Sequence, residues 1–335
     1  MLLEEGAKTA VKTCMGVKPD EDLVILSDDS TLNIGKKLKE AAFEITDHVE
    51  FFNLDSYGNR PLSTFPDVIK NEVERADVTF WTAHSYEGEL ESVRQPFIEN
   101  ALAGGRHGHM VNVTKKVMEC GMTVDYNKIS EFTNHLAQKA KDVDTIRVKN
   151  EQGTDIEVTF SDKRRWVPSD GIYHEPNHWG NLPDGEVYTA PLTMEGKIVV
   201  DGLLGDYFPN KFPHSDLVET PLTVMVENNE KPHSTQISCD NDEIEKEVKD
   251  YLSKHECSSI VGEFGLGTNI FLENFSNNSL LDEKYPGVHI ALGDPLGGDT
   301  GADWKCPEHL DMILTKCDVW FDDEMIMENG EYLIR

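Results

Sequence analysis

The sequence predicts two domains, an α/β domain with a parallel sheet followed by a strand-rich α+β domain, and three observations predict this arrangement. The chain has 335 residues, and at about 150 residues per domain that length suggests two. Up to residue 143, short apolar runs alternate with helical patterns, which is typical of βαβ units and a parallel sheet. Beyond that point short β runs dominate. We therefore expect one domain over residues 1–143 and a second over residues 144–335.

The first domain is expected to begin with a strand, a turn and a helix. Residues 23–26 form an apolar run of the kind found in buried strands. A polar turn over residues 27–30 follows, and apolar side chains then recur at helical spacing. This turn lacks the pattern G-x-G-x-x-G, so we expect no dinucleotide site. Further strands are expected over residues 49–54 and 78–81, and helices over residues 68–76 and 129–140.

The second domain is expected to open with a hairpin. Two β runs, residues 145–148 and 156–160, flank the turn sequence Asn-Glu-Gln-Gly. One clear helical pattern, residues 242–254, interrupts the strands that follow. Those strands are expected over residues 186–190, 197–204, 222–227, 260–261, 288–292 and 309–314.

The net charge separates this chain from proteins that bind anionic polymers or anionic surfaces. Asp and Glu number 62 against 31 Lys and Arg, which gives a net charge of −31 at pH 7. A surface this acidic repels nucleic-acid phosphates and anionic lipids, so we expect no nucleic acid and no membrane among its partners. No apolar run approaches the length of about 18 residues that a membrane helix needs. The first residues carry no signal-peptide pattern, so we expect a cytoplasmic protein.

The six cysteines show no metal-binding or redox motif, because no pair has C-x-x-C spacing. A chain of this size does not need disulfides. In the reducing compartment expected here, all six should be free thiols.

One apparent metal motif is rejected. Residues 174–178, His-Glu-Pro-Asn-His, match the zincin pattern H-E-x-x-H. That chemistry needs a helix, which brings both histidines to one face. Pro176 lacks an N–H group and disfavours helical geometry at Glu175, so we expect His174 and His178 on a loop.

Five other residues form the candidate site. A Pro-Asp-Gly turn delivers Glu186 to the start of a strand, and Glu263 ends an apolar strand inside a glycine-rich segment. His289 alternates with apolar residues in another strand, and His309 and Asp311 share one face of the last strand. Taken separately, Glu186 is consistent with a solvated strand residue and His289 with a hydrogen-bonded interior residue.

Together the segments around these residues resemble a known family. G-N-L-P-D-G-E-V-Y-T-A-P, G-E-F-G-L-G-T-N, H-I-A-L-G and H-L-D resemble, in order and spacing, the metal-site motifs of the aminopeptidase T and aminopeptidase S metallopeptidases, family M29, over residues 180–314. The resemblance implies a metal-dependent aminopeptidase that acts on peptides and forms a homodimer. It implies two divalent metal ions, with Glu186, Glu263, His289, His309 and Asp311 as their ligands.

The chemistry of these side chains supports the same set. Three carboxylates in one pocket carry a charge of about −3, which would raise their pKa values unless cations compensate it. Oxygen and imidazole ligands without thiolate suit Zn, Co, Mn or Fe. Two such ions can activate a water and polarise a peptide carbonyl. Glu263, beside small glycines, is expected both to bind metal and to accept the proton of that water, with a role as a plain ligand as the alternative.

One departure from the family pattern keeps two other functions open. Family members commonly have a Tyr where this chain has Leu296, and Tyr188 or Tyr285 could replace its hydroxyl. A mononuclear Fe(II) dioxygenase of the 2,5-dihydroxypyridine type, using His289, His309 and Asp311, is the first alternative. The second alternative is a member that binds metal and peptide without turnover.

Overall fold

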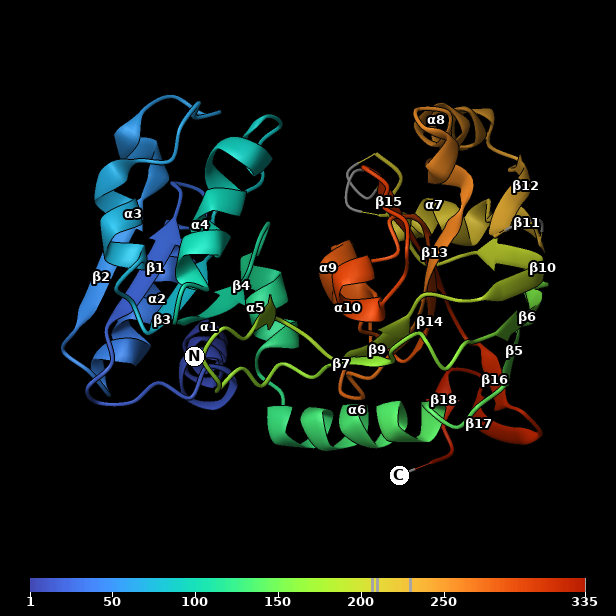
Figure 1. The fold of residues 1–335 in the computed structure, drawn as a ribbon, viewed down its shortest axis with the longest axis horizontal. Coiled ribbons are helices and arrows are strands. Elements are labelled where there is room, and N and C mark those ends of the chain that lie inside the picture. Colours follow the sequence, from blue (N-terminus) through green and yellow to red (C-terminus); the bar gives the residue numbers. More distant parts are fainter. Residues whose placement is uncertain (206–207, 209–210, 229–230, 335) are drawn as a thin grey trace. The chain divides into compact units, whose positions relative to one another are not determined.

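The computed structural model of the protein describes residues 1–205, 208, 211–228 and 231–334. Its elements gather into two compact units (Figure 1). The first unit comprises Met1–Ser130 and Asp170–Asp184, and the second comprises Glu131–Ser169 and Gly185–Arg335. Within the described residues, no helix has the length and apolar character that crossing a membrane requires.

This division differs from the single boundary expected at residue 143. After β7 (Val167–Ser169) of the second unit, the chain adds β8 (Trp179–Asn181) to the sheet of the first unit. There β8 pairs in parallel with β4 (Arg106–His109). A strand of three residues carries almost no periodicity, so the sequence pattern did not indicate this excursion.

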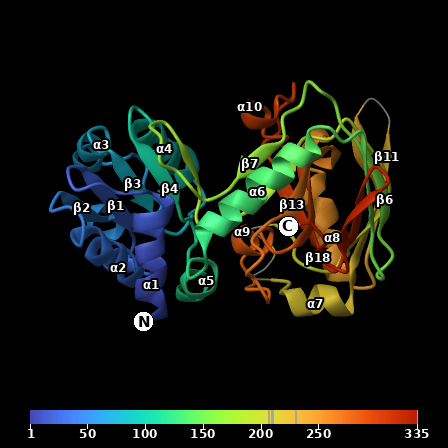
Figure 2. The ribbon, with the colours of Figure 1, turned by 90° about the horizontal axis from the view of Figure 1, so that it is seen from below.

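The first unit has the expected α/β character. Its helices are α1 (Leu2–Lys8), α2 (Leu32–Phe43), α3 (Asp67–Val73), α4 (Gln95–Ala101), α5 (Lys115–Gly121) and α6 (Tyr126–Ala140), which continues into the second unit, with short helical turns at Thr9–Cys14, Leu54–Tyr57 and Leu90–Arg94. With β1 (Leu23–Ser27), β2 (Val49–Asn53) and β3 (Val78–Trp81), five parallel strands form sheet A in the order β2-β1-β3-β4-β8. Figure 2 shows α1 and α2 on one face of this sheet and α3 and α4 on the other. Cover on both faces explains why every residue of β1 is buried.

The loop that carries the H-E-x-x-H sequence belongs to the first unit. Residues 172–178 contain no helix, and Asn177 has a positive φ of 61°. His174 makes a 2.8 Å hydrogen bond from Nε2 to the carbonyl oxygen of Thr13. The structure therefore agrees with the rejection of a zincin site.

The second unit has the expected strand-rich character, and its described residues form two antiparallel sheets. Sheet B has the order β12-β11-β10-β6-β5-β16-β17-β18, and sheet C has the order β15-β14-β13-β9-β7. The predicted hairpin is confirmed as β5 and β6. The strands of sheet B are β5 (Thr145–Lys149), β6 (Asp155–Thr159), β10 (Thr193–Val200), β11 (Leu222–Asn228), β12 (Pro232–Ser238), β16 (Asp318–Phe321), β17 (Glu324–Glu328) and β18 (Glu331–Tyr332). Those of sheet C, besides β7, are β9 (Glu186–Thr189), β13 (Val261–Gly267), β14 (Gly287–Gly293) and β15 (His309–Leu314).

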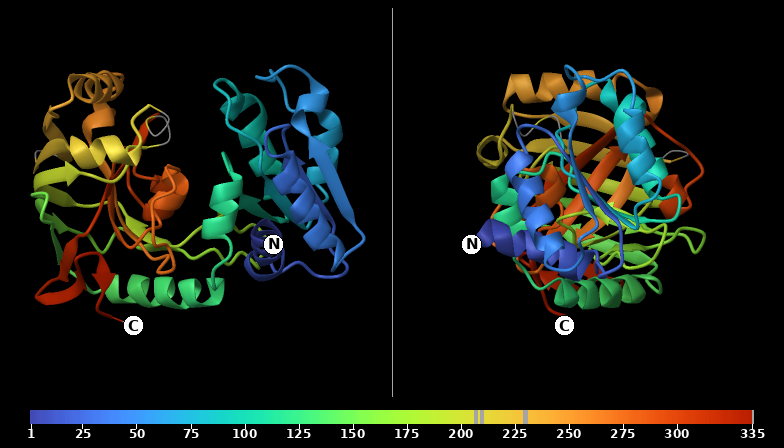
Figure 3. Two further views of the ribbon diagram at one scale, coloured as in Figure 1. Left: turned by 180° about the vertical axis from the view of Figure 1, so that it is seen from behind. Right: turned by 90° about the vertical axis from the view of Figure 1, so that its left-hand side faces the viewer.

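Sheets B and C share one hydrophobic core, and Figure 3 shows the backbone of the second unit from behind. Val288, Ile290 and Leu292 of β14 point into it, together with apolar residues of sheet B. Alternation along the strand therefore directs His289 to the opposite face of sheet C. The helical segments of this unit are α7 (His214–Glu219), α8 (Asp242–Leu252), α9 (Ser279–Asp282), α10 (Gly297–Thr300) and a turn at Glu256–Ser259.

Helix α8 confirms the one helix expected in this part of the chain. The Asn241 side chain accepts hydrogen bonds from the backbone N–H groups of Glu243 and Ile244, which is the usual device for starting a helix. Ile244, Val248 and Leu252, four residues apart, are its buried face.

The expectation of six free thiols is wrong for two cysteines. Cys257 and Cys306 form a disulfide, with their Cα atoms 5.7 Å apart. Cys14, Cys120, Cys239 and Cys317 are free. The pair joins the Glu256–Ser259 turn to the segment before β15, two regions that are 49 residues apart in the sequence and were not expected to meet.

Reduction of this disulfide is expected to lower the free energy of unfolding by about 2–4 kcal/mol, because the cross-link restricts a long loop in the unfolded chain. Urea unfolding of the protein with and without a dithiol measures the change. Cys120→Ser, which removes an exposed free thiol, is the control and should unfold like the wild type. Titration of six thiols in the unfolded, unreduced protein would contradict the disulfide.

Candidate metal centre

All five candidate residues lie on sheet C. Glu186 is the first residue of β9, Glu263 lies in β13 and His289 in β14, and His309 and Asp311 both lie in β15. These four strands are successive neighbours in the sheet. The sheet therefore brings together side chains that are up to 125 residues apart in the sequence.

Three of the five residues form a buried group. The ligand atoms of Glu186, Glu263 and His289 all lie within 4.8 Å of one another. The Nε2 atom of His289 is 3.3 Å from Glu186 Oε2 and 3.1 Å from Glu263 Oε1. Each of these residues exposes 6% or less of its surface, so this group is largely withdrawn from solvent.

The other two residues lie against the second oxygen of Glu263. The Nε2 atom of His309 is 3.5 Å from Glu263 Oε2 and 3.3 Å from Asp311 Oδ1. Glu263 therefore presents one carboxylate oxygen to His289 and the other to His309. The His309 side chain is 27% exposed, so the site is more open on this side.

Backbone groups orient the two histidines. Nδ1 of His309 is 2.9 Å from the carbonyl oxygen of Asp294. A carbonyl can only accept, so Nδ1 carries the proton, and Nε2 of the neutral ring is left as a lone-pair donor. His289 lies across Gly265, and a Cβ atom at Gly265 would overlap its imidazole ring.

The electrostatics of the site favour bound cations. Burial opposes charging of His289, but its hydrogen bond to Glu263 and the charges of Glu186, Glu263 and Asp311 raise its pKa. Burial opposes charging of His309 as well, and the charge of Asp311 nevertheless raises its pKa well above the usual value. Burial raises the pKa of Asp311, and the opposing charge of His309 outweighs it and brings the value down to about 2. A divalent cation would satisfy the same negative field and displace these protons.

The chemistry of the donor atoms fits such a cation. The site offers carboxylate oxygens and imidazole nitrogens and no thiolate, a set that suits Zn, Co, Mn or Fe. Glu186, Glu263 and His289 would hold one ion, and Glu263, His309 and Asp311 would hold a second.

Sequence reasoning missed a lysine in this site. Lys284 is fully buried, and its Nζ atom lies 2.6 Å from Glu186 Oε1 and 2.6 Å from Glu283 Oε1. Burial raises the pKa of Glu283 well above its usual value, although the charge of Lys284 acts against this shift. The only signal in the sequence is the charged run Asp-Glu-Lys just before the strand of His289, and such runs are usually solvated.

Tyr188 is the tyrosine beside the site. It shares the site face of β9 with Glu186 and lies opposite Gly265, which in turn pairs with His289. Burial raises the pKa of its phenol, and the charges of Asp299, Glu263 and Glu186 add to the shift. Tyr285, by contrast, packs with its ring 5.0 Å from that of Phe275.

The position of the family tyrosine has no hydroxyl in this chain. Leu296 is the residue that precedes α10, and it has a left-handed backbone with φ of 50°. Its N–H donates a 2.8 Å hydrogen bond to Asp294 Oδ1.

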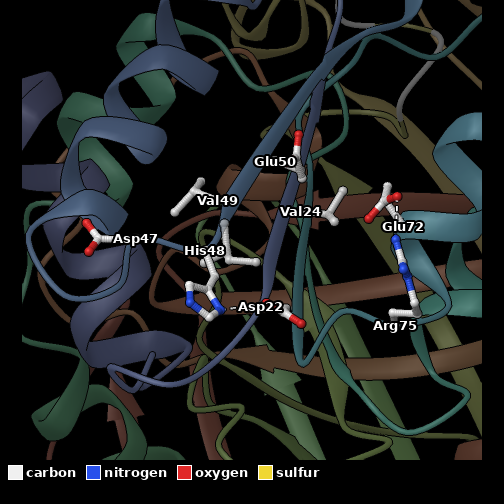
Figure 4. Close-up of a pocket in the computed structure, with 9 residues that line it drawn as sticks. Asp22, Val24, Asp47, His48, Val49, Glu50, Glu72 and Arg75 are labelled. Carbon is white, nitrogen blue, oxygen red and sulfur yellow. Dashed lines mark hydrogen bonds and ion pairs between the residues drawn. The ribbon is translucent and has the colours of Figure 1, made fainter.

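A pocket of about 350 Å³ in the first unit holds none of the five candidate residues. Figure 4 shows it at the start of β1 and β2. Four of its polar side chains form two pairs, with His48 Nδ1 2.9 Å from Asp22 Oδ1 and Arg75 Nη2 2.5 Å from Glu72 Oε1. Both sides of the His48–Asp22 pair are 60% exposed, so the pocket is a solvated surface hollow.

Solved structures that share this fold include the following two. One is a 2,5-dihydroxypyridine dioxygenase from Pseudomonas putida, with a TM-score of 0.72 and 18% identity over 99% of this chain and 97% of that one. The other is wild-type AmpT from Thermus thermophilus, with a TM-score of 0.64 and 15% identity over 99% of both chains. At these identities the likeness concerns the fold alone.

The sequence itself carries the family signature. Among curated proteins none matches the chain significantly. A family profile described as thermophilic metalloprotease (M29) matches residues 125–297, more than half of the chain. The matched segment includes Glu186, Glu263 and His289, and His309 and Asp311 follow it. The chain therefore belongs to the M29 family of metalloproteases.

Proposed function

We propose that this protein is a metal-dependent aminopeptidase that releases N-terminal residues from peptides and uses two divalent ions, Zn, Co or Mn. The observation that carries the proposal is the position of Glu263, whose two oxygens lie 3.1 Å from His289 Nε2 and 3.5 Å from His309 Nε2. A carboxylate between two histidines is suited to bridge two ions. Membership of the M29 family supports peptide hydrolysis as the reaction.

Each ion would have its own protein ligands in addition to the shared Glu263. Glu186 and His289 would complete one subsite, and His309 and Asp311 the other. When bound, the ions would lower the pKa of a water between them and polarise the carbonyl of the scissile peptide bond.

The groups around the ions would transfer protons during the reaction and hold the metal ligands and the substrate in position. Glu263, beside Gly262 and Gly265, is the carboxylate that would accept the proton of the attacking water and pass it to the leaving amine. The carbonyl of Asp294 keeps His309 in the tautomer that binds metal through Nε2. The phenol of Tyr188 is the hydroxyl that would donate to the oxyanion in place of the family tyrosine, and acidic side chains would hold the free amine of the substrate.

A cytoplasmic location and a homodimeric state are part of the proposal and rest on the sequence alone. The acidic charge and the M29 resemblance are their support. Light scattering at micromolar protein concentration tests the dimer.

A ring-cleaving Fe(II) dioxygenase is the second candidate, and the fold likeness to the 2,5-dihydroxypyridine dioxygenase favours it. Such a site needs two histidines and one carboxylate on a single ion. His289, His309 and Asp311 would supply these ligands. Burial of both Glu186 and Glu263 beside His289 favours the dinuclear hydrolase, because a mononuclear site needs at most one of them.

Metal analysis combined with activity tests the proposal. The purified protein is stripped of metal, reloaded with Zn, Co or Mn in turn, and assayed for release of free amino acids from aminoacyl substrates and short peptides. We expect two ions per chain and amino-acid release, both lost in Glu186→Ala. Glu195→Ala, which changes an exposed glutamate of β10, is the control and should retain both.

The alternatives give other results. One iron per chain, oxygen consumption with a dihydroxypyridine and no peptide cleavage would replace the hydrolase by the dioxygenase. Two ions without turnover on any peptide would indicate a member that binds but does not cleave, with Leu296 as the first residue to examine.

A further inference from the structure

A fully buried lysine lies in the wall of the candidate metal centre. Lys284 exposes none of its surface, and it lies two residues after the end of α9, where backbone hydrogen bonds fix it. Its N–H donates to Leu281 O at 3.1 Å, and its carbonyl accepts from Asn269 N–H at 2.9 Å. Lysine is almost never fully buried without a charged partner, so its partners indicate its role.

The ammonium group of Lys284 contacts two carboxylates. Its Nζ atom is 2.6 Å from Glu283 Oε1 and 2.6 Å from Glu186 Oε1. The other oxygen of Glu186, Oε2, is 3.3 Å from His289 Nε2. The two oxygens of Glu186 are therefore divided, one toward the ammonium group and one toward the histidine.

Stability alone does not account for the contact with Glu186. Glu283, the chain neighbour of Lys284, already accepts a 2.6 Å hydrogen bond from the ammonium group. A buried ion pair adds little net stability, because desolvation offsets much of the attraction. The second contact, to a residue of a different strand, therefore requires a reason of its own.

We propose that Lys284 is a positioning residue that holds Glu186 Oε1 away from the metal centre, so that Glu186 offers only Oε2 to an ion. The role rests on the proposed function, because Glu186 and His289 are ligands of one subsite there. Glu283 fixes the ammonium group from the other side, so the lysine cannot follow a movement of Glu186.

The physical basis is preorganisation of a ligand by the groups behind it. A glutamate with both oxygens free can rotate, bind an ion through both oxygens or turn away from it. A group that orients a metal ligand typically contributes a factor of about 10–100 in metal affinity. The same lysine also carries a positive charge, which by itself opposes cation binding. The two effects have opposite signs, and this makes the role testable.

The test uses two variants of the full chain. Lys284→Met removes the ammonium group and keeps the length of the side chain. The double variant Glu283→Gln with Lys284→Met also removes the second carboxyl group that contacts the ammonium group. In Lys284→Met, both Glu186 and Glu283 lose the ammonium group that contacts them. In the double variant only the carboxylate of Glu186 does, so this variant keeps the test possible if Lys284→Met alone fails to fold.

The readout is metal affinity rather than activity. Metal-free protein is titrated with Zn²⁺ or Co²⁺ by calorimetry, and the visible absorption of the cobalt form reports its coordination. We expect wild-type protein to bind two ions, and both variants to bind one of them about 10- to 100-fold more weakly with an altered cobalt spectrum. Lys249→Met, which removes an exposed ion pair with Glu245 on α8, should bind as the wild type does.

Two results would overturn the positioning role. Tighter binding by Lys284→Met with an unchanged cobalt spectrum would make Lys284 a counter-charge only. Unchanged affinity and spectrum in both variants would make its contact with Glu186 irrelevant to the metal centre. A wild-type chain that takes up no divalent ion would instead overturn the proposed function and this role with it, so the two failures are distinguishable.

Discussion

Glu263→Gln is expected to lower kcat/KM for peptide hydrolysis by about 10²- to 10⁴-fold, the usual contribution of a catalytic acid or base. The amide keeps the size of the side chain, but it presents an NH₂ group in place of one carboxylate oxygen. One of the two histidines, His289 at 3.1 Å or His309 at 3.5 Å, then faces a donor. The variant loses the proton acceptor and one ligand of the centre together.

The measurement is steady-state kinetics on an aminoacyl substrate after metal loading, with the bound metal counted in the same sample. Glu157→Gln makes the same chemical change on an exposed face of β6 and should leave kcat/KM unchanged. If Glu263→Gln bound two ions per chain and kept the kcat/KM of the wild type, Glu263 would be neither the proton acceptor nor the ligand shared by the two ions. A full metal complement with lost turnover would separate the role in proton transfer from the role as ligand.

Strands β1 and β3 of the parallel sheet were predictable because each is a short run of mainly apolar residues. Buried strands such as β1 leave a signal that does not depend on their neighbours. Strand β4, Arg-His-Gly-His, is buried but contains no apolar run, and β8 has only three residues, so the sequence indicated neither. Residues 170–184 belong to the first unit because of tertiary contacts, and no local sequence pattern indicates this.

The last antiparallel strands, β16 to β18, were missed although turn signals were present. The turns on either side of β17 contain Asp322 and Asn329, both with left-handed backbone, and Asn-Gly is a strong hairpin signal. The acidic residues between them weakened the alternation that would have identified strands. A closer reading of turn chemistry could have found this meander.

The five candidate metal ligands were predictable from the sequence, but the residues that contact and position them were not. Alternation in β14 places His289 opposite the core, and His309 and Asp311 share a face by spacing alone. Lys284 belongs to a charged run that is polar in any local pattern, and only the tertiary structure brings its ammonium group to within 2.6 Å of Glu186. The Cys257–Cys306 pair was missed for the same reason, since 49 residues separate its members.

Gly265→Ala is expected to lower kcat/KM by about 100-fold, the effect of a displacement of about 1 Å in a catalytic group. Gly265 has no positive φ, so its backbone accepts alanine. The added Cβ atom would overlap the imidazole of His289, which lies directly over the glycine. The ring would have to move out of the position between Glu186 and Glu263, and crowding in this packed strand would also reduce the free energy of unfolding by about 1–3 kcal/mol.

The variant tests whether the glycine-rich strand exists to admit the histidine. Calorimetric titration of the metal-free variant should show weaker binding at the subsite of Glu186 and His289, with the subsite of His309 and Asp311 retained. Gly298→Ala is the matched control, because a Cβ atom there meets no atom within 4 Å. If Gly265→Ala kept wild-type affinity for both ions, the imidazole of His289 would have to bind from another position, and its assignment as a ligand through Nε2 would be wrong. Weaker binding of only one of the two ions would show that Gly265 in β13 is needed for the geometry of that subsite. A general loss of stability would instead weaken the binding of both ions.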